Sequence, residues 1–202
     1  MTVDHFEDTV SLDVTVPIWD HFFLVHNLVV IGSHQAGGEH DLAPKHMAMP
    51  LGWQNYFGFV CTPQHRTYLN VKQEREFTVS FPRPSQVVAT SLTAAPRCND
   101  DSKPSLEALP TFHAKTVDAL FLSDSYLYLE CRLHRIVDGF GDNSLITGQI
   151  TGAYAHRDSL RARERDDGDM LYDSPLLAYI APGRFARISD TQAFPFPEHY
   201  KR

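Results

Sequence analysis

The residues of this chain whose types and spacing could do chemistry are concentrated between positions 41 and 82. Residues 44–50 read PKHMAMP, a short connection with a cation near its start. A small side chain such as Ala48 lets backbone N–H groups approach a flat ligand closely, and Lys45 favours negative charge on that ligand. Composition alone favours a simpler interpretation, a plain connection between strands in which Lys45 and His46 face solvent.

A second polar cluster follows at residues 62–70, TPQHRTYLN, where a strand is expected to lead into a helix. Hydroxyl groups, a guanidinium and free N–H groups at a helix start are suited to binding a phosphate. The simpler interpretation is an ordinary helix cap by Thr62 or His65 beside an exposed Arg66. The two clusters flank one aromatic strand, and bent strands in a barrel could bring both clusters around one elongated ligand.

Most of the elements that must position these clusters are predicted to be strands, because short apolar runs end at Gly, Pro or polar residues. Residues 42–52 carry prolines near both ends, which favours an irregular loop or a short strand. Helices are expected over 64–75 and in fragments of 85–95. The predicted strands are 22–33, 53–62, 76–82, 120–139 (as one strand or a pair) and 144–156.

This pattern predicts a single mainly β domain over residues 1–202, a barrel with a few short helices. An N-terminal arm of about residues 1–20 and a proline-punctuated tail of about residues 175–202 are expected to flank the barrel. Gly148 and Gly152 interrupt a strand, which indicates bulges or close contacts there.

Charge and cysteine content exclude several classes of partner. The formal net charge of −7 argues against a nucleic-acid or membrane-surface partner. Cys61, Cys98 and Cys131 lie far apart, so a disulfide framework is not expected, and buried, inert thiols in a reducing cytoplasm are. The acidic N-terminus and the lack of an apolar run near the ~20 residues of a membrane helix favour a soluble, cytoplasmic protein.

Other catalytic or metal-binding patterns are weak. The chain has 11 histidines, but His34, His40, His46 and His65 lack HxH or HExxH spacing, so no metal site is expected. Neither a GxSxG elbow nor a GxGxxG loop is present. Glu130 lies in a predicted strand, and a solvated position is the expectation for its carboxylate.

Taken in order, the segments resemble the flavin reductase-like, FMN-binding split-barrel family. The matching segments are NLVVIGS, APKHMAMP, YFGFVCTP, HRTYLNV and REFTVSFP, and the resemblance covers roughly residues 20–160. Many members of that family have Ser or Thr in the ring-facing loop, where this chain has KHMAM. The segment after Pro82 also departs from the small-residue, glycine-containing pattern of the family.

The resemblance implies a split β-barrel of Greek-key type, a homodimer, and a bound FMN, with FAD as a possible replacement. The ring would be bordered by Lys45, His46, Met47 and Ala48. The ribityl chain and phosphate would be held by Thr62, His65, Arg66, Thr67 and Asn70. The C-terminal segment of the partner, with Tyr179, Arg184 and Phe185, would cover the site.

The implied activity is that of an NAD(P)H-dependent flavin reductase, in which a nicotinamide passes a hydride to flavin N5. No side chain is then required as catalytic acid, base or nucleophile. Two alternatives remain open. One is a non-enzymatic FMN-binding electron carrier or redox sensor, and the other is a split barrel that binds another planar cofactor, such as haem or a deazaflavin.

Overall fold

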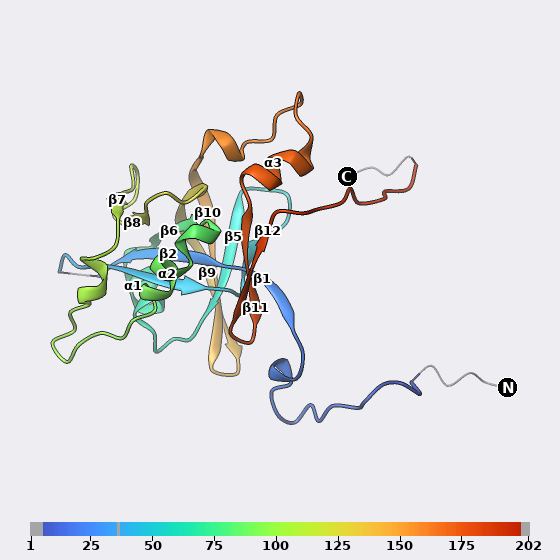
Figure 1. Ribbon diagram of the computed structural model, residues 1–202. Coiled ribbons are helices and arrows are strands. Elements are labelled where there is room, and N and C mark those ends of the chain that lie inside the picture. The colour runs from blue at the N-terminus through green and yellow to red at the C-terminus, as the bar shows by residue number, and fades with distance from the viewer. Residues whose placement is uncertain (1–5, 36, 199–202) are drawn as a thin grey trace.

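Seven antiparallel strands form the main sheet of the molecule. The computed structural model describes residues 6–35 and 37–198. Figure 1 shows this sheet curling around the centre of the molecule, with α1 and α2 beside β2. In spatial order the sheet contains β3 (His40–Lys45), β2 (Val29–His34), β6 (Glu76–Phe81), β9 (Leu127–Phe140), β10 (Asn143–Ala155), β5 (Tyr56–Cys61) and β4 (Ala48–Pro50).

Two smaller sheets and short helices complete the described part of the chain, so the mainly β prediction is confirmed. None of the described helices has the length and apolar character needed to span a membrane. The second sheet contains β1 (Leu24–Asn27), β11 (Leu176–Ala181) and β12 (Arg184–Ile188), and the third contains β7 (Thr111–His113) and β8 (Leu120–Leu122). The α-helices are α1 (Arg66–Glu74), α2 (Val87–Leu92) and α3 (Asp167–Asp173), with 3-10 turns at Trp19–His21, Pro84–Gln86, Pro104–Leu106 and Arg157–Ser159.

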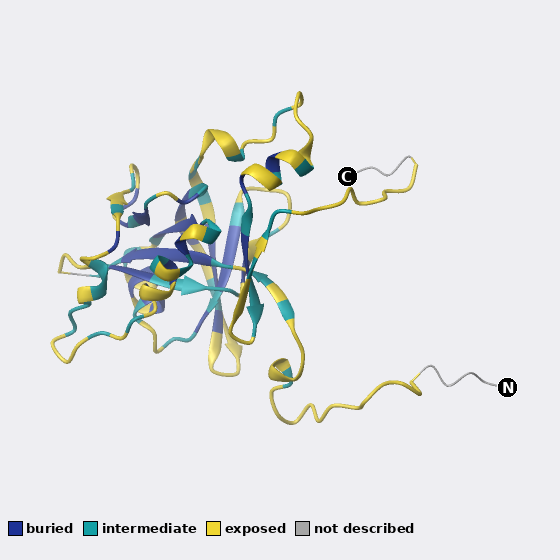
Figure 2. Ribbon diagram, in the orientation of Figure 1, coloured by how far each residue is buried: buried dark blue, intermediate teal, exposed yellow. Residues whose placement is uncertain are grey.

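The main core forms on one face of the sheet because apolar residues alternate along β6. Phe77 and Phe81 point into this core, where Phe77 meets Phe59 edge to face at 5.3 Å between ring centroids. Phe81 meets Phe57 at 5.8 Å in the same geometry. Figure 2 shows β2, β5 and β6 as the buried centre of the molecule, with the N-terminal arm exposed.

The opposite face of the sheet is crossed by residues 111–122, here called the strap. Thr78 of β6 points toward the strap and donates a hydrogen bond of 2.6 Å to the Leu120 carbonyl. Gly32 lies beside Thr78 on β2, and a Cβ at Gly32 would stand 2.1 Å from that carbonyl oxygen. Glycine at position 32 is therefore required by the close approach of the strap backbone.

The buried carboxylate of Glu130 continues this polar row under the strap, on β9 beside Thr78. The residue is 0% exposed, so the expectation of a solvated carboxylate is wrong. Its oxygens accept from the N–H of Lys115 at 2.7 Å, from the N–H of Thr116 at 3.0 Å and from the Thr116 hydroxyl. A strand pattern does not show which polar face a distant segment will cover.

Two other boundaries differ from the sequence prediction. Residues 22–33 form two strands in different sheets, since β1 pairs with β11 whereas β2 pairs with β3 and β6. The predicted tail from about residue 175 begins with the β11–β12 hairpin, because β1 offers it a free edge for pairing. An apolar run shows that a strand exists, but not where the chain changes partners.

Pro44 and Pro50 are tolerated within strands because β3 and β4 are the two edges of the main sheet. This leaves only His46 and Met47 as the connection between the two strands. The bulges expected near Gly148 and Gly152 are present as register shifts between β9 and β10. Cys61 and Cys131 are buried as expected, whereas Cys98 is exposed because it lies in the loop after α2.

The carboxylate of Glu130 is expected to stabilise the strap on the sheet. Replacing Glu130 by Gln should lower the free energy of unfolding by about 2–4 kcal/mol, because the amide NH2 would face N–H donors in a dry site. Glu107→Gln makes the same chemical change at an exposed position and serves as the matched control. Urea unfolding at neutral pH measures both variants, and equal stability of the two would contradict the role given to Glu130.

Candidate functional site

A cleft of about 510 Å³ lies between the end of β3, the start of α1 and the segment that follows α2. Alternation along β3 directs Asp41, Ala43 and Lys45 toward the cleft, whereas Leu42 packs into a separate apolar cluster on the other face. The full lining comprises Asp41, Ala43, Pro44, Lys45, Gln64, His65, Arg66, Thr67, Thr93, Ala94, Ala95, Pro96, Arg97, Asp101 and Lys103.

The start of α1 supplies hydrogen-bond donors to this cleft. His65 holds the N-cap position in an extended conformation, and its side chain makes no capping hydrogen bond. The backbone N–H groups of Arg66 and Thr67 have no acceptor among residues 6–35 and 37–198. Free N–H groups at the first turn of a nine-residue helix, together with the helix dipole, favour an anion.

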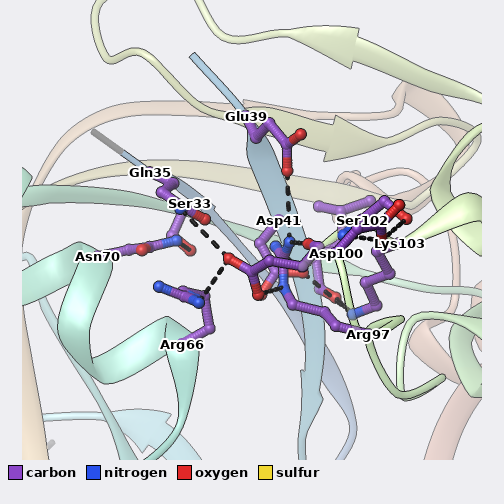
Figure 3. A network of polar contacts seen from close by, with 12 residues as sticks. Ser33, Gln35, Glu39, Asp41, Arg66, Asn70, Arg97, Asp100, Ser102 and Lys103 are labelled. Carbon is purple, nitrogen blue, oxygen red and sulfur yellow. Dashed lines mark hydrogen bonds and ion pairs between the residues drawn. The ribbon is translucent and has the colours of Figure 1, made fainter. Parts of the chain in front are cut away.

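A network of charged side chains forms one wall of the cleft (Figure 3). Asp101 accepts from Arg66 at 2.6 Å and from Gln35 at 3.4 Å. Its backbone is left-handed, with φ +66°, which is unusual for a residue other than glycine. The cleft contains the cations of Lys45, Arg66, Arg97 and Lys103 against the carboxylates of Asp41 and Asp101, an excess of positive charge in a chain of net charge −7.

Arg97 carries a buried nitrogen that is incompletely paired. One terminal nitrogen of its guanidinium has no hydrogen bond, although the Asp41 carboxylate lies 3.4 Å away. The distance satisfies an ion pair but the alignment does not satisfy a hydrogen bond, so we take the donor as free. A buried donor without an acceptor costs about 1–3 kcal/mol, which a bound anion would recover.

A second, more apolar pocket of about 280 Å³ adjoins the cleft and shares Pro44 and Ala94 with it. The Thr90 hydroxyl is buried in its wall without a hydrogen-bond partner. The pocket is lined by Leu28, Pro44, Val87, Thr90, Ser91, Ala94, Tyr179, Gly183, Arg184 and Phe185. The three C-terminal residues expected to cover the site in the partner chain, Tyr179, Arg184 and Phe185, thus line a pocket of their own chain.

Two imidazoles near Lys45 have lowered pKa values. Burial lowers the pKa of His46, and the charges of His26 and Lys45 lower it further. Burial likewise lowers the pKa of His65, with a smaller contribution from Lys45. The His46 ring lies 4.7 Å from the ring of Tyr179, between centroids, so it is positioned at the side of the second pocket.

The structure brings together four of the nine residues predicted from the sequence, since Lys45, His65, Arg66 and Thr67 line one cleft. His46 lies beside the second pocket, against Tyr179. The remaining four lie outside both pockets: Met47 is exposed, Ala48 packs in the main core, Thr62 accepts from the His65 N–H, and Asn70 is buried and donates to the Ser33 hydroxyl at 3.1 Å.

Sequence reasoning missed the wall opposite α1. Arg97, Asp101 and Lys103 fall in a polar, proline-containing stretch that reads as an ordinary loop. Their role depends on Asp41, which is more than fifty positions earlier and joins them only through the fold. The only sequence signal was the unusual density of charge between two prolines.

A family model matches most of the chain. Residues 23–187 match the model of the flavin reductase like domain. The chain belongs to the flavin reductase-like family. No curated protein sequence matches it.

Solved structures of this class share the split-barrel fold at low sequence identity. A split barrel domain protein of Shewanella frigidimarina superposes with a TM-score of 0.74 at 17% identity, covering 86% of this chain and 87% of that one. A flavoredoxin from Methanosarcina acetivorans gives 0.71 at 19%, covering 92% and 94%. An FMN-binding protein from Thermus thermophilus gives 0.73 at 19%, covering 92% and 98%.

Removing the charge of Lys45 is expected to raise the pKa of both His46 and His65. In Lys45→Met, burial remains the main influence, so both pKa values should rise but stay below the ordinary histidine value. Lys72→Met is the matched control, since Lys72 lies over the Tyr68 ring and contributes to neither shift. NMR titration of the imidazole protons measures the change, and unaltered pKa values in Lys45→Met would rule out this electrostatic coupling.

Proposed function

We propose that this protein binds FMN and acts as an NAD(P)H-dependent flavin oxidoreductase. The observation that carries the proposal is the pair of adjoining pockets, each with one buried donor that makes no hydrogen bond. Arg97 supplies this donor in the cationic cleft, and Thr90 supplies it in the apolar pocket. An elongated ligand with an anionic end and a planar end fits this division, and the combined size lies within the usual range for ligand sites.

The phosphate of FMN would lie at the cationic end. Arg66 and Arg97 offer guanidinium donors, and the free N–H groups of Arg66 and Thr67 point out of the first turn of α1. Charge-assisted hydrogen bonds and a helix N-terminus are the usual partners of a phosphate. An adenine-extended flavin such as FAD would need the same contacts for its pyrophosphate.

The ring would lie toward Lys45, His46 and the second pocket. Apolar contacts from Pro44 and Ala94 suit a flat aromatic system, and the Thr90 hydroxyl offers a hydrogen bond to its polar edge. Lys45 places a positive charge beside this region, which stabilises electron density gained by a ligand there. The imidazoles of His46 and His65, whose pKa values are lowered by burial and by Lys45, add hydrogen-bonding capacity there.

The division of labour follows from these contacts. A flavin held by these residues would supply the redox chemistry, the acceptance of a hydride from NAD(P)H. The residues of this chain bind the phosphate and orient the ring, and Lys45 places its positive charge beside the ring. No side chain is assigned as nucleophile, acid or base.

A homodimer in the cytoplasm is part of the proposal. Trp19, Phe23 and Val25 expose large apolar side chains on the N-terminal arm and β1, close to the β11–β12 hairpin that lines the second pocket. A second copy that covers this surface would bury it and shield the ring end of the site. The three cysteines form no disulfide, which suits a reducing compartment.

An electron carrier is the second candidate. One of the similar structures is that of a flavoredoxin, and this name specifies a flavin but no substrate, which favours a carrier. The phosphate and ring contacts would be the same. The two candidates differ only in whether a reduced nicotinamide reacts directly at this site.

An absorption experiment tests the proposal directly. The purified protein with FMN is treated anaerobically with NADH and then NADPH. Bleaching of the oxidised-flavin band faster than for free FMN is expected. Bound flavin that stays oxidised would overturn the reductase activity in favour of the carrier, and a failure to bind FMN would overturn both.

Arg66→Ala is expected to weaken FMN binding by tenfold or more, because a hydrogen bond to a charged group contributes about 1.5–3 kcal/mol. Arg163→Ala removes an exposed guanidinium far along the chain and is the matched control. Quenching of flavin fluorescence on binding gives both dissociation constants. If riboflavin, which lacks the phosphate, loses as much affinity as FMN in Arg66→Ala, the phosphate assignment is wrong.

A further inference from the structure

Three imidazoles and one carboxylate gather on the main sheet, on the side of β3 opposite the cleft. They belong to His34 at the end of β2, His40 at the start of β3, and His113 and Asp118 of the strap. None of the four lines either pocket of the proposed flavin site. Their proximity therefore requires an explanation of its own.

Strand register and strand alternation bring the two sheet histidines together. His34 pairs directly with His40 across the β2–β3 ladder, so both side chains leave the same face. This is the face of Gly32, two positions before His34, over which the strap passes. Asp41 follows His40 and points the other way, into the cleft.

The strap places the side chains of His113 and Asp118 over this histidine pair. The Asp118 carboxylate lies 2.8 Å from Nε2 of His40 and 3.5 Å from Nδ1 of His34. The ring centroid of His40 lies 5.1 Å from that of His34 and 5.1 Å from that of His113. Ligand-capable atoms of His40, His113 and Asp118 all lie within 4.8 Å of one another.

We propose that His40, His113 and Asp118 bind one divalent transition-metal ion of the zinc class, with His34, which contacts Asp118, as the fourth ligand. Ligands at roughly 2.0–2.2 Å from a tetrahedral zinc stand roughly 3.4 Å apart, so small side-chain rotations would close the spacing of His40, His113 and Asp118 around one ion. Imidazole nitrogens with a single carboxylate suit zinc and its neighbours, whereas magnesium and calcium prefer oxygen ligands only. This departs from the expectation of no metal site, which considered only spacing along the chain.

The surroundings hold one ligand in place and leave the site accessible. The backbone N–H of Asp118 donates to the Glu76 carboxylate at 2.6 Å. This hydrogen bond fixes the strap at Asp118, the residue that contributes the carboxylate ligand. Glu76 is itself paired with Arg132. The His34 and His40 side chains are 18% exposed and that of Asp118 is 57% exposed, so an ion can enter from solvent.

A bound ion would fasten the strap to the β2–β3 edge of the sheet. The strap also covers Glu130 and Thr78, so the metal would add to contacts that already hold it. Binding to the folded protein alone raises its stability by mass action. The cleft lies across β3, and the metal is therefore assigned a stabilising role without direct contact with the flavin.

Zinc titration of the untagged, chelator-treated protein tests the site, by calorimetry and in the presence of FMN. One ion per chain is expected, together with a rise in melting temperature. Binding should weaken by tenfold or more in His40→Ala and in His113→Ala, as loss of a ligand costs at least the 10–100-fold lost with an outer-shell partner. Asp118→Asn keeps the shape of the side chain and should also weaken binding.

His156→Ala is the matched control. His156 and Asp158 form a surface pair at 2.9 Å, much like the pair of His40 and Asp118, but they lie outside the cluster. Zinc affinity in this variant should equal that of the unaltered protein. Cobalt, added in place of zinc, should give the strong visible absorption of a tetrahedral ion at wavelengths beyond the flavin bands.

Three results would overturn the proposal. The first is that the unaltered protein binds no zinc. The second is that His40→Ala and His113→Ala bind zinc as tightly as the unaltered protein does. The third is that His156→Ala loses as much zinc affinity as those two variants. In the first two cases the cluster is a hydrogen-bonded group of histidines around Asp118 that takes no ion. Because the readouts are heat, melting temperature and cobalt absorption, they are independent of whether the protein reduces flavin.

Discussion

The buried ion pair between Asp41 and Lys103 is the interaction on which the cleft depends. Both side chains are almost fully buried, and the ammonium lies 3.0 Å from the Asp41 carboxylate. It also donates to the carbonyls of Leu42 at 2.8 Å and Thr93 at 2.7 Å, so all three of its N–H groups are used. Removing one partner of such a pair strands a buried charge, at a cost of about 3–5 kcal/mol. The pair therefore fixes β3 against the segment after α2, and the walls of the cleft are set by that distance.

The two faces of β3 carry two different groups of side chains. Asp41 and Lys45 face the cleft. His40 faces the strap, and Leu42 packs in the apolar cluster with Val30, Leu109 and Leu122. Because side chains alternate along a strand, a one-residue slip would exchange these sets and destroy both arrangements at once. Register is held by direct pairing with β2 over the whole strand and by the strap carbonyl that approaches Gly32. Local packing and the two sites thus depend on the same alignment.

The sequence predicted α1 and the strand before it, β5, because apolar periodicity is a local property, whereas residues 42–52 were expected to form an irregular loop or a short strand and most of β3 was not predicted. Lys45, His65, Arg66 and Thr67, which line one cleft, could be singled out because they lie in two short clusters beside one strand. Arg97, Thr90 and the His40–Asp118 contact could not, since each depends on segments that meet only through sheet pairing or through the strap. Asn70, singled out from the same polar cluster, is instead buried outside the cleft lining and donates a hydrogen bond to Ser33. The partner of a polar side chain can be identified only once the tertiary contacts are known.

Asp101 is the residue at which structure and binding compete. Its carboxylate pairs with Arg66 in the region proposed for the phosphate, and the two side chains are 40% and 35% exposed. An ion pair so accessible to water contributes about 0–1 kcal/mol, which is less than a phosphate gains from a guanidinium and free backbone N–H groups. A phosphate bound as proposed would therefore have only a weak, solvent-accessible ion pair to displace in order to reach Arg66.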